Sequence, residues 1–152
     1  LDYGYQIGKA IEMHPGDDLT VIACGVPVKQ ARDAAEYLKK EDGVNVRVLN
    51  MHTIKPIDIE AIHKAIDDTR RILTVEDHNI MGGLGGAVAE VIAEYGKSCV
   101  FRRLGLPDEY SIVGYPEDLY HIYQEDDAGI MKNVREMLKL EAEELVIDWD
   151  ED

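Results

Sequence analysis

The sequence predicts an α/β domain of three layers, in which helices cover both faces of a mixed five-stranded sheet. Short apolar runs alternate with segments of helical periodicity along nearly the whole chain. The helical segments are about a dozen residues long, which is the length that crossovers between parallel strands require. With 152 residues and 45% hydrophobic side chains, the chain matches one ordinary domain with a sizeable core.

The first part of the chain supplies two strands and the helix between them. Residues 19–24 form a compact β-rich apolar run, and residues 44–50 alternate in polarity as a strand does. A helix is expected over 27–41, because Pro27 suits a first turn and apolar side chains recur there at helical spacing. These side chains are Val28, Ala31, Ala35 and Leu38.

The second part continues the alternation. A helix is expected over 58–68, with Asp58 at its N-cap. Its apolar face is formed by Ile59, Ile62 and Ile66. Strands at 71–76 and 98–104 flank a helix of small residues at 84–95. A closing helix is expected over 126–143, with Ile130, Val134, Met137 and Leu138 facing inward.

One further strand, at residues 7–13, precedes the first parallel strand. Only the four residues 15–18 (PGDD) separate the two. A connection of this length permits an antiparallel neighbour, but it is too short for a crossover between parallel strands. We therefore expect residues 7–13 to form the one antiparallel strand, at an edge of the sheet.

Acidic side chains dominate the charge of the chain. There are 31 of them against 16 basic side chains, which gives a net charge of −15. This excess argues against nucleic acid and anionic membranes as partners, because both need a basic surface. No apolar run reaches the roughly 18 to 20 residues that span a bilayer, and residues 1–15 do not resemble a signal peptide. We expect a cytoplasmic protein.

The acidic charge is concentrated at the end of the chain. Residues 141–152 (EAEELVIDWDED) carry seven acids and no base, which leaves 24 acids and 16 bases in residues 1–140. We therefore assign residues 1–140 to a single domain and residues 141–152 to an acidic tail that contains Trp149.

The loop after strand 71–76 is the most unusual segment. Ligands of open parallel sheets bind at the carboxyl ends of the strands, where this loop is expected. Glu76, Asp77 and His78 end the strand, and four glycines then open the next helix. Glycine lets a ligand or another chain approach closely, and the backbone N–H groups of a helix N-terminus attract anions. The four glycines are Gly82, Gly83, Gly85 and Gly86.

Three interpretations of this loop compete. A dinucleotide fingerprint is disfavoured, because Val88 stands where its third glycine belongs. Metal or acid–base chemistry at Glu76, Asp77 and His78 is weakly signalled, since metal ligands usually converge from several elements. In the third interpretation, Glu76 and His78 hydrogen-bond the glycine turn, and the glycines allow close packing against another domain or subunit. We assign no catalytic, cofactor-binding or metal residue. The candidates for an anion site or an interface are Glu76, His78, Gly82, Gly83, Gly85 and Gly86.

Four tyrosines lie within fourteen residues near the end of the domain: Tyr110, Tyr115, Tyr120 and Tyr123. Packing in the core or at an interface explains such a cluster better than a ligand platform does, because tyrosine combines a large apolar ring with one polar group.

Several stretches resemble the C-terminal domain of transketolase and its thiamine-diphosphate-dependent relatives. They lie at 7–13, 17–38, 44–58, 71–90 and 103–123, so the resemblance covers nearly the whole chain except the tail. The motifs TIKPID and TVEDH followed by GG.G are specific to this family. The histidine after Glu-Asp is most similar to that of transketolase proper, including its split two-chain form.

The resemblance implies a supporting role within a larger enzyme. In this family thiamine diphosphate and magnesium are held between two other domains. One of these carries a GDG signature, which is missing from these residues, and the other carries an activating glutamate. The chain alone is therefore expected to bind no cofactor and to be inactive. Its expected partners are the cofactor-binding domains or subunit of the same enzyme, and a second copy in a homodimer. The assembled enzyme would transfer a two-carbon ketol unit between sugar phosphates.

Two alternatives remain open. The chain could be a free-standing anion-binding or protein-interaction module of the same fold. It could also be the equivalent domain of deoxyxylulose-phosphate synthase or of the β subunit of a 2-oxo-acid dehydrogenase. The sequence does not distinguish a subunit of a split enzyme from an excised fragment.

Overall fold

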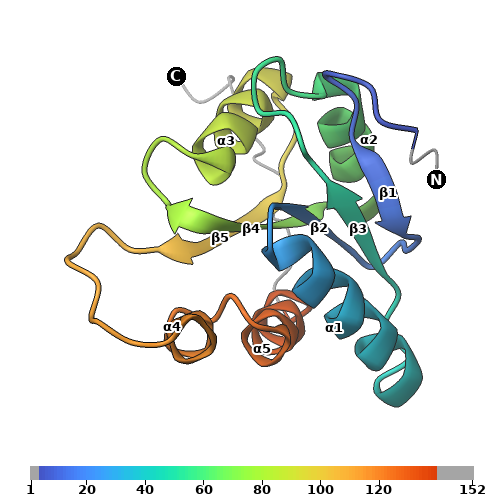
Figure 1. Cartoon of the computed structure of the whole chain (residues 1–152). Coiled ribbons are helices and arrows are strands. Elements are labelled where there is room, and N and C mark those ends of the chain that lie inside the picture. Colours follow the sequence, from blue (N-terminus) through green and yellow to red (C-terminus); the bar gives the residue numbers. More distant parts are fainter. Residues whose placement is uncertain (1–3, 140–152) are drawn as a thin grey trace, which may run out of the picture.

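The computed structural model describes residues 4–139, and these form a sheet of five strands between two layers of helices (Figure 1). The three-layer α/β class predicted from the sequence is confirmed. The elements in chain order are β1 (Ile11–His14), β2 (Leu19–Cys24), α1 (Pro27–Glu41), β3 (Val46–Asn50), α2 (Ile59–Thr69), β4 (Arg71–Asn79), α3 (Leu84–Tyr95), β5 (Val100–Leu106), α4 (Pro116–Ile122) and α5 (Asp127–Met137).

The strand order across the sheet is β1-β3-β2-β4-β5. Strands β2 to β5 are parallel, and β1 runs antiparallel to β3 at one edge. The inner strand β2 and most of its neighbour β4 are buried. Their buried runs are mostly apolar, because both faces of the sheet are covered by helices.

The antiparallel edge strand was predicted, but it spans Ile11–His14 and not residues 7–13. Its hydrogen-bonding partner is β3 and not the strand that follows it directly. The connection between β1 and β2 passes the start of β3, where the backbone N–H groups of Asp17 and Asp18 bind the carbonyl of Asn45. Gly16 lies so close to Val46 that a Cβ would be 2.4 Å from its carbonyl carbon. Four residues are enough to cross one strand, since neighbouring strands lie only about 5 Å apart.

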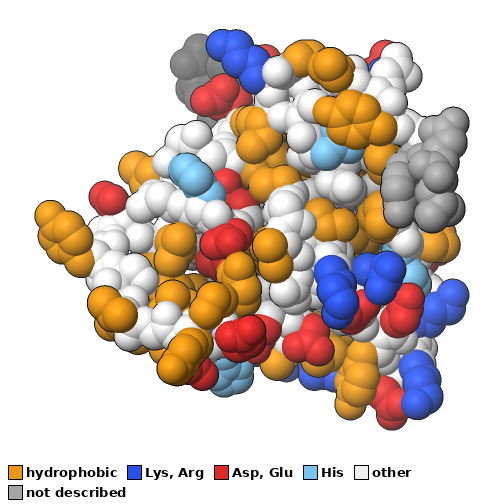
Figure 2. Space-filling model, viewed as in Figure 1, with side chains coloured by type: hydrophobic (Ala, Val, Ile, Leu, Met, Phe, Trp, Pro, Cys, Tyr) orange, Lys and Arg blue, Asp and Glu red, His pale blue; other side chains and the backbone are white. Residues whose placement is uncertain are grey.

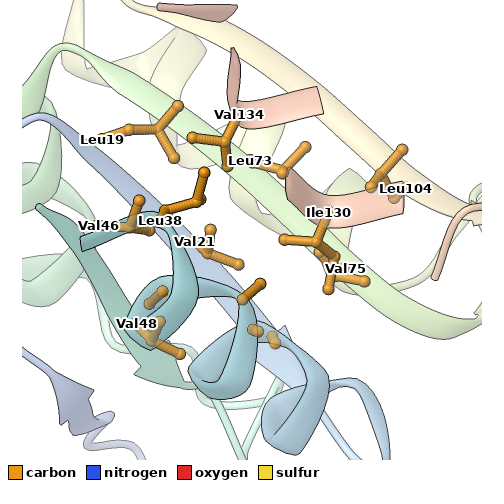
Figure 3. Packing of buried hydrophobic residues seen from close by; sticks show 14 of the residues in the cluster. Leu19, Val21, Leu38, Val46, Val48, Leu73, Val75, Leu104, Ile130 and Val134 are labelled. Carbon is orange, nitrogen blue, oxygen red and sulfur yellow. The ribbon is translucent and has the colours of Figure 1, made fainter. Parts of the chain in front are cut away.

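Helices α1 and α5 cover one face of the sheet (Figure 3). Leu38 of α1 and Val134 of α5 pack with Val21 and Leu73 from the central strands. The predicted inward residues of α5 lie in or against this core. Burial of each such aliphatic side chain contributes roughly 1.5 to 3 kcal/mol, so this layer anchors the end of the described chain.

Helices α2 and α3 cover the other face, where Ile62 and Ile66 of α2 pack with Leu84 and Val88 of α3. Asp58 caps α2 as predicted, because its side chain accepts a hydrogen bond from the N–H of Ala61. Ile59, by contrast, is exposed and does not belong to the predicted apolar face.

Three further features differ from the sequence-based expectations. Strand β4 continues through Asp77 and His78 to Asn79, three residues beyond the expected end. The short helix α4 was not predicted. Helix α5 ends at Met137, and residues 140–152, with the predicted acidic tail, lie outside the described residues. No helix in residues 4–139 is long and apolar enough to cross a bilayer.

Candidate functional site

The glycine loop lies at the carboxyl end of β4, and its centre is the side chain of Glu76. This side chain is 1% exposed and points toward the N-terminus of α3. Its oxygens accept hydrogen bonds from the backbone N–H groups of Leu84 at 2.6 Å and Gly85 at 2.7 Å. The carboxylate therefore satisfies two N–H groups that a helix leaves free at its start, and its charge lies at the positive end of the helix dipole.

Three of the four glycines are explained by contacts or conformation within the chain. Gly82 has a positive φ of 79°. A Cβ on Gly83 would lie 1.9 Å from Glu76 Oε2, and one on Gly85 would lie 2.7 Å from Arg103 Cδ. Gly86 has neither constraint, because a Cβ there would meet no atom within 4 Å and its φ is not positive. A glycine at this position is not required by the described chain.

His78 lies beside Gly83, because a Cβ there would be 3.0 Å from its Nδ1, but its hydrogen bond goes elsewhere. Its side chain is 61% exposed, and its Nδ1 lies 2.7 Å from the carbonyl oxygen of Asn79. The same nitrogen is 4.0 Å from Glu76 Oε2. Of the two residues expected to hold the glycine turn by hydrogen bonds, Glu76 does so and His78 does not.

A buried acidic residue that the sequence did not single out lies near the end of β4. Glu125, in the connection between α4 and α5, is 1% exposed, and its Oε1 has no hydrogen-bond partner among the described residues. Burial raises its pKa to about 7, and the nearby charges of Asp77 and Glu76 act in the same direction. Asp77 accepts a hydrogen bond of 2.9 Å from the hydroxyl of Tyr120. Glu125 was missed because it stands in an acidic run and only packing distinguishes it.

A separate open cleft of about 650 Å³ lies beside the carboxyl end of β2. It is lined by Cys24, His52, Lys29 and Arg32, among others. Both cations already contact the carboxylate of Asp33, Lys29 at 2.5 Å and Arg32 at 3.0 Å. The cleft therefore carries little free positive charge for an anion.

The described residues offer no cluster of three or more histidine, cysteine or acidic side chains that could hold a metal ion. Both oxygens of Glu76 accept hydrogen bonds from backbone amides, so this carboxylate is not free to bind a metal ion. These residues do not fit magnesium and a diphosphate, because such a site needs free oxygen ligands arranged around the ion.

Comparison with known proteins identifies the family. The model of the family described as "Transketolase, C-terminal domain" matches residues 8–130, a range that contains all five strands of the described sheet. The chain belongs to the transketolase C-terminal domain family.

Two curated relatives of this transketolase domain are subunits or sections of enzymes. A subunit of the apulose-4-phosphate transketolase of Phocaeicola vulgatus is 41% identical over 91% of this chain and 43% of its own length. The putative transketolase C-terminal section of Methanocaldococcus jannaschii is 44% identical over 90% of this chain and 42% of its own. A 1-deoxy-D-xylulose-5-phosphate synthase of Heliobacterium modesticaldum is 37% identical over 86% of this chain, but the match covers 20% of that protein. The chain thus spans less than half the length of these relatives.

A solved structure leads to the same family as the sequence relatives. A split-gene transketolase, described as an inactive tetramer of its beta chains, superposes with a TM-score of 0.83 at 30% identity, over 90% of this chain and 44% of that one. The transketolase C-terminal domain fold predicted from the resemblance is therefore confirmed.

Proposed function

We propose that this chain supplies the C-terminal domain of a thiamine-diphosphate-dependent transketolase-type enzyme of the split, two-chain kind. The enzyme transfers a two-carbon ketol unit between sugar phosphates. The observation that carries this proposal is the likeness, over about nine-tenths of the chain, to one subunit of a transketolase and to a split-gene transketolase. Since the chain spans less than half of each, the rest of the enzyme supplies the remaining domains.

Within that enzyme the domain supports assembly, and we assign it no catalytic residue. The carboxylate at the carboxyl end of the sheet, Glu76, already stabilises the start of α3. Thiamine diphosphate and magnesium belong to the other domains of the assembled enzyme, where the chemistry of the cofactor carries the difficult step. The isolated chain is therefore expected to be inactive and to bind neither.

The proposed partners are the cofactor-binding subunit and, in the assembled enzyme, a second copy of this chain. The open space beside Gly86 supports a close approach there, because nothing in the described chain fills it. The cytoplasmic location remains a prediction from the sequence.

A ketol-transfer assay tests the activity. The chain is combined with its native cofactor-binding partner and supplied with xylulose 5-phosphate, ribose 5-phosphate, thiamine diphosphate and magnesium. Cofactor-dependent turnover that requires this chain supports the proposal. A folded, cofactor-loaded partner complex without turnover would overturn it as a transketolase acting on these sugars.

The second candidate is the equivalent domain of a 1-deoxy-D-xylulose-5-phosphate synthase, which the 37% identity to such an enzyme favours. Formation of 1-deoxy-D-xylulose 5-phosphate by the same complex distinguishes it. A free-standing anion-binding module is less well supported, because Glu76 already binds two of the N–H groups that an anion would need.

A further inference from the structure

An exposed apolar surface lies between the end of β5 and the end of α4. Every residue from Asp108 to Asp118 is exposed, although this stretch contains large apolar side chains. Tyr110 and Val113 are as exposed as in an extended peptide, at 104% and 103%. The apolar members of this surface, called here the β5–α4 surface, are Tyr110, Ile112, Val113, Tyr115 and Ile122.

Packing within the described residues does not account for the apolar side chains of this surface. Helix α4 has no buried residue and contributes nothing to either core cluster. The segment is held by polar contacts instead. The hydroxyl of Tyr120 donates a hydrogen bond to Asp77 of β4, and the hydroxyl of Tyr123 donates one to Ser111 within the segment. None of the four clustered tyrosines belongs to a core cluster. Packing in the core, one of the two explanations that the sequence offered for them, is therefore wrong.

An exposed group of apolar residues of this kind marks a contact site in soluble proteins. Tyrosine suits such sites, because its ring contributes a large contact area at a small cost in conformational entropy. In Figure 2 the apolar side chains gather at the left edge of the molecule, over the connection from β5 to α4, and acidic side chains lie beside them.

The charge around this surface has one sign. Between Arg103 and Lys132 the chain has no lysine or arginine. Besides the buried Glu125, the same stretch holds six acids that are exposed or partly exposed: Asp108, Glu109, Glu117, Asp118, Asp126 and Asp127. A partner that fits must therefore present an apolar centre with a basic rim.

We propose that the β5–α4 surface docks onto an apolar, basic-rimmed surface of the cofactor-binding subunit. This inference rests on the proposed function, in which that subunit is a partner of this chain. More than half the length of the relatives has no counterpart in this chain, so their remaining domains need surfaces on which to pack.

Two other occupants fit the charge less well. A second copy of this chain, docked through the same surface, would bring two acidic rims together, and such like-charge contacts are unfavourable. The acidic stretch 141–152 carries seven acids and no base, so it would be repelled for the same reason.

The test compares two matched variants in the complex with the native cofactor-binding subunit. Tyr110→Glu places a charge in the β5–α4 surface. Tyr37→Glu makes the same change on α1, where Tyr37 is 50% exposed and outside the surface. The dissociation constant of the complex is measured by sedimentation or calorimetry, and circular dichroism verifies that both variants are folded.

We expect Tyr110→Glu to raise the dissociation constant at least about tenfold, and Tyr37→Glu to change it less than about twofold. Raising the salt concentration should weaken the wild-type complex, because it screens the acidic rim. Equal affinities for Tyr110→Glu and wild type would overturn the docking proposal, whatever the activity. A concentration-dependent dimer of the chain alone that Tyr110→Glu abolishes would overturn it in favour of a second copy.

The activity assay separates this proposal from the proposed function. If the complex forms and Tyr110→Glu weakens it, but the complex transfers no ketol unit, the docking surface is supported and the transketolase activity is overturned. If ketol transfer persists and the affinity is unchanged by Tyr110→Glu, the activity is supported and the docking surface is overturned.

Discussion

Glu76 and Leu84 are joined by a buried hydrogen bond of 2.6 Å, in which the carboxylate at the end of β4 accepts from the first backbone N–H of α3. The second oxygen of Glu76 accepts from the next N–H, that of Gly85. The glycine loop thus ends in a helix whose N-terminal charge is already balanced by the strand before it. This pair of bonds sets the expectations for the loop.

Replacing Glu76 with Gln should destabilise the domain by about 2–3 kcal/mol, because a buried amide can accept at only one of the two positions. Urea unfolding monitored by circular dichroism measures the change. Glu90→Gln, on the exposed side of the same helix, is the control and should shift the free energy of unfolding by less than about 0.5 kcal/mol. Equal effects of the two substitutions would contradict the helix-capping role.

Alanine at Gly83 and at Gly86 should have opposite effects. A Cβ on Gly83 would collide with Glu76 Oε2, so Gly83→Ala should cost about 1–3 kcal/mol. A Cβ on Gly86 meets nothing, and alanine favours a helix, so Gly86→Ala should stabilise the isolated chain by about 0.5–1 kcal/mol. Thermal unfolding of both variants checks the sign. A destabilising Gly86→Ala would show that the space beside it is not open.

Glu125 should make stability fall as the pH rises. Its pKa is about 7 in the folded chain and near the ordinary value of 4.5 in the unfolded chain, so the folded state binds the proton more tightly. The advantage is fully present below pH 4.5 and disappears as the pH rises through about 7.

Glu125→Gln removes this titration. The free energy of unfolding of Glu125→Gln minus that of wild type should be larger at pH 8 than at pH 5, by on the order of 1–2 kcal/mol. This difference is smaller than the full pKa shift would give, because the neighbouring Asp77 is exposed to solvent. Denaturant unfolding at the two pH values provides the comparison. Asp127→Asn, an exposed acid in the first turn of α5, serves as the control. Parallel pH profiles for wild type and Glu125→Gln would refute the assignment.

The two cysteines should react slowly with alkylating agents. Burial raises the pKa of both thiols to about 11, and the charges of Glu76 and Asp77 add to the effect at Cys24. At pH 7 the thiolate fraction is then roughly 100-fold below that of a thiol with pKa 9. Mass spectrometry after timed exposure to iodoacetamide measures the rate for Cys24 and Cys99 separately. Modification as fast as in urea would contradict the expectation.

The sequence predicts the parallel centre of the fold well, because there local and tertiary requirements coincide. Strand β2 is buried on both faces, so its residues are apolar almost without interruption, and this pattern is visible in isolation. The apolar face of α1 and the capping residue Asp58 of α2 are equally local signals. The partner of β1 is not local, since the same short connection permits pairing with either β2 or β3.

Helix α4 was missed for a different reason. Its sequence, PEDLYHI, shows no apolar face because no side of this helix packs into the described core. In the candidate site, the glycine pattern pointed to the loop. Only the distances show that Glu76 leaves no room for a side chain at Gly83, whereas there is room for one at Gly86. Glu125 gave no signal at all, because its burial depends on the approach of β4.

The pairing of β1 with β3 also fixes an order of events during synthesis. Ile11 is matched with Asn50, so the first strand emerges from the ribosome nearly forty residues before the only strand with which it pairs in the described sheet. Until Val46–Asn50 is available, residues 11–14 have no β-ladder to join. The start of this domain therefore has to wait for residues made later before it can join the sheet.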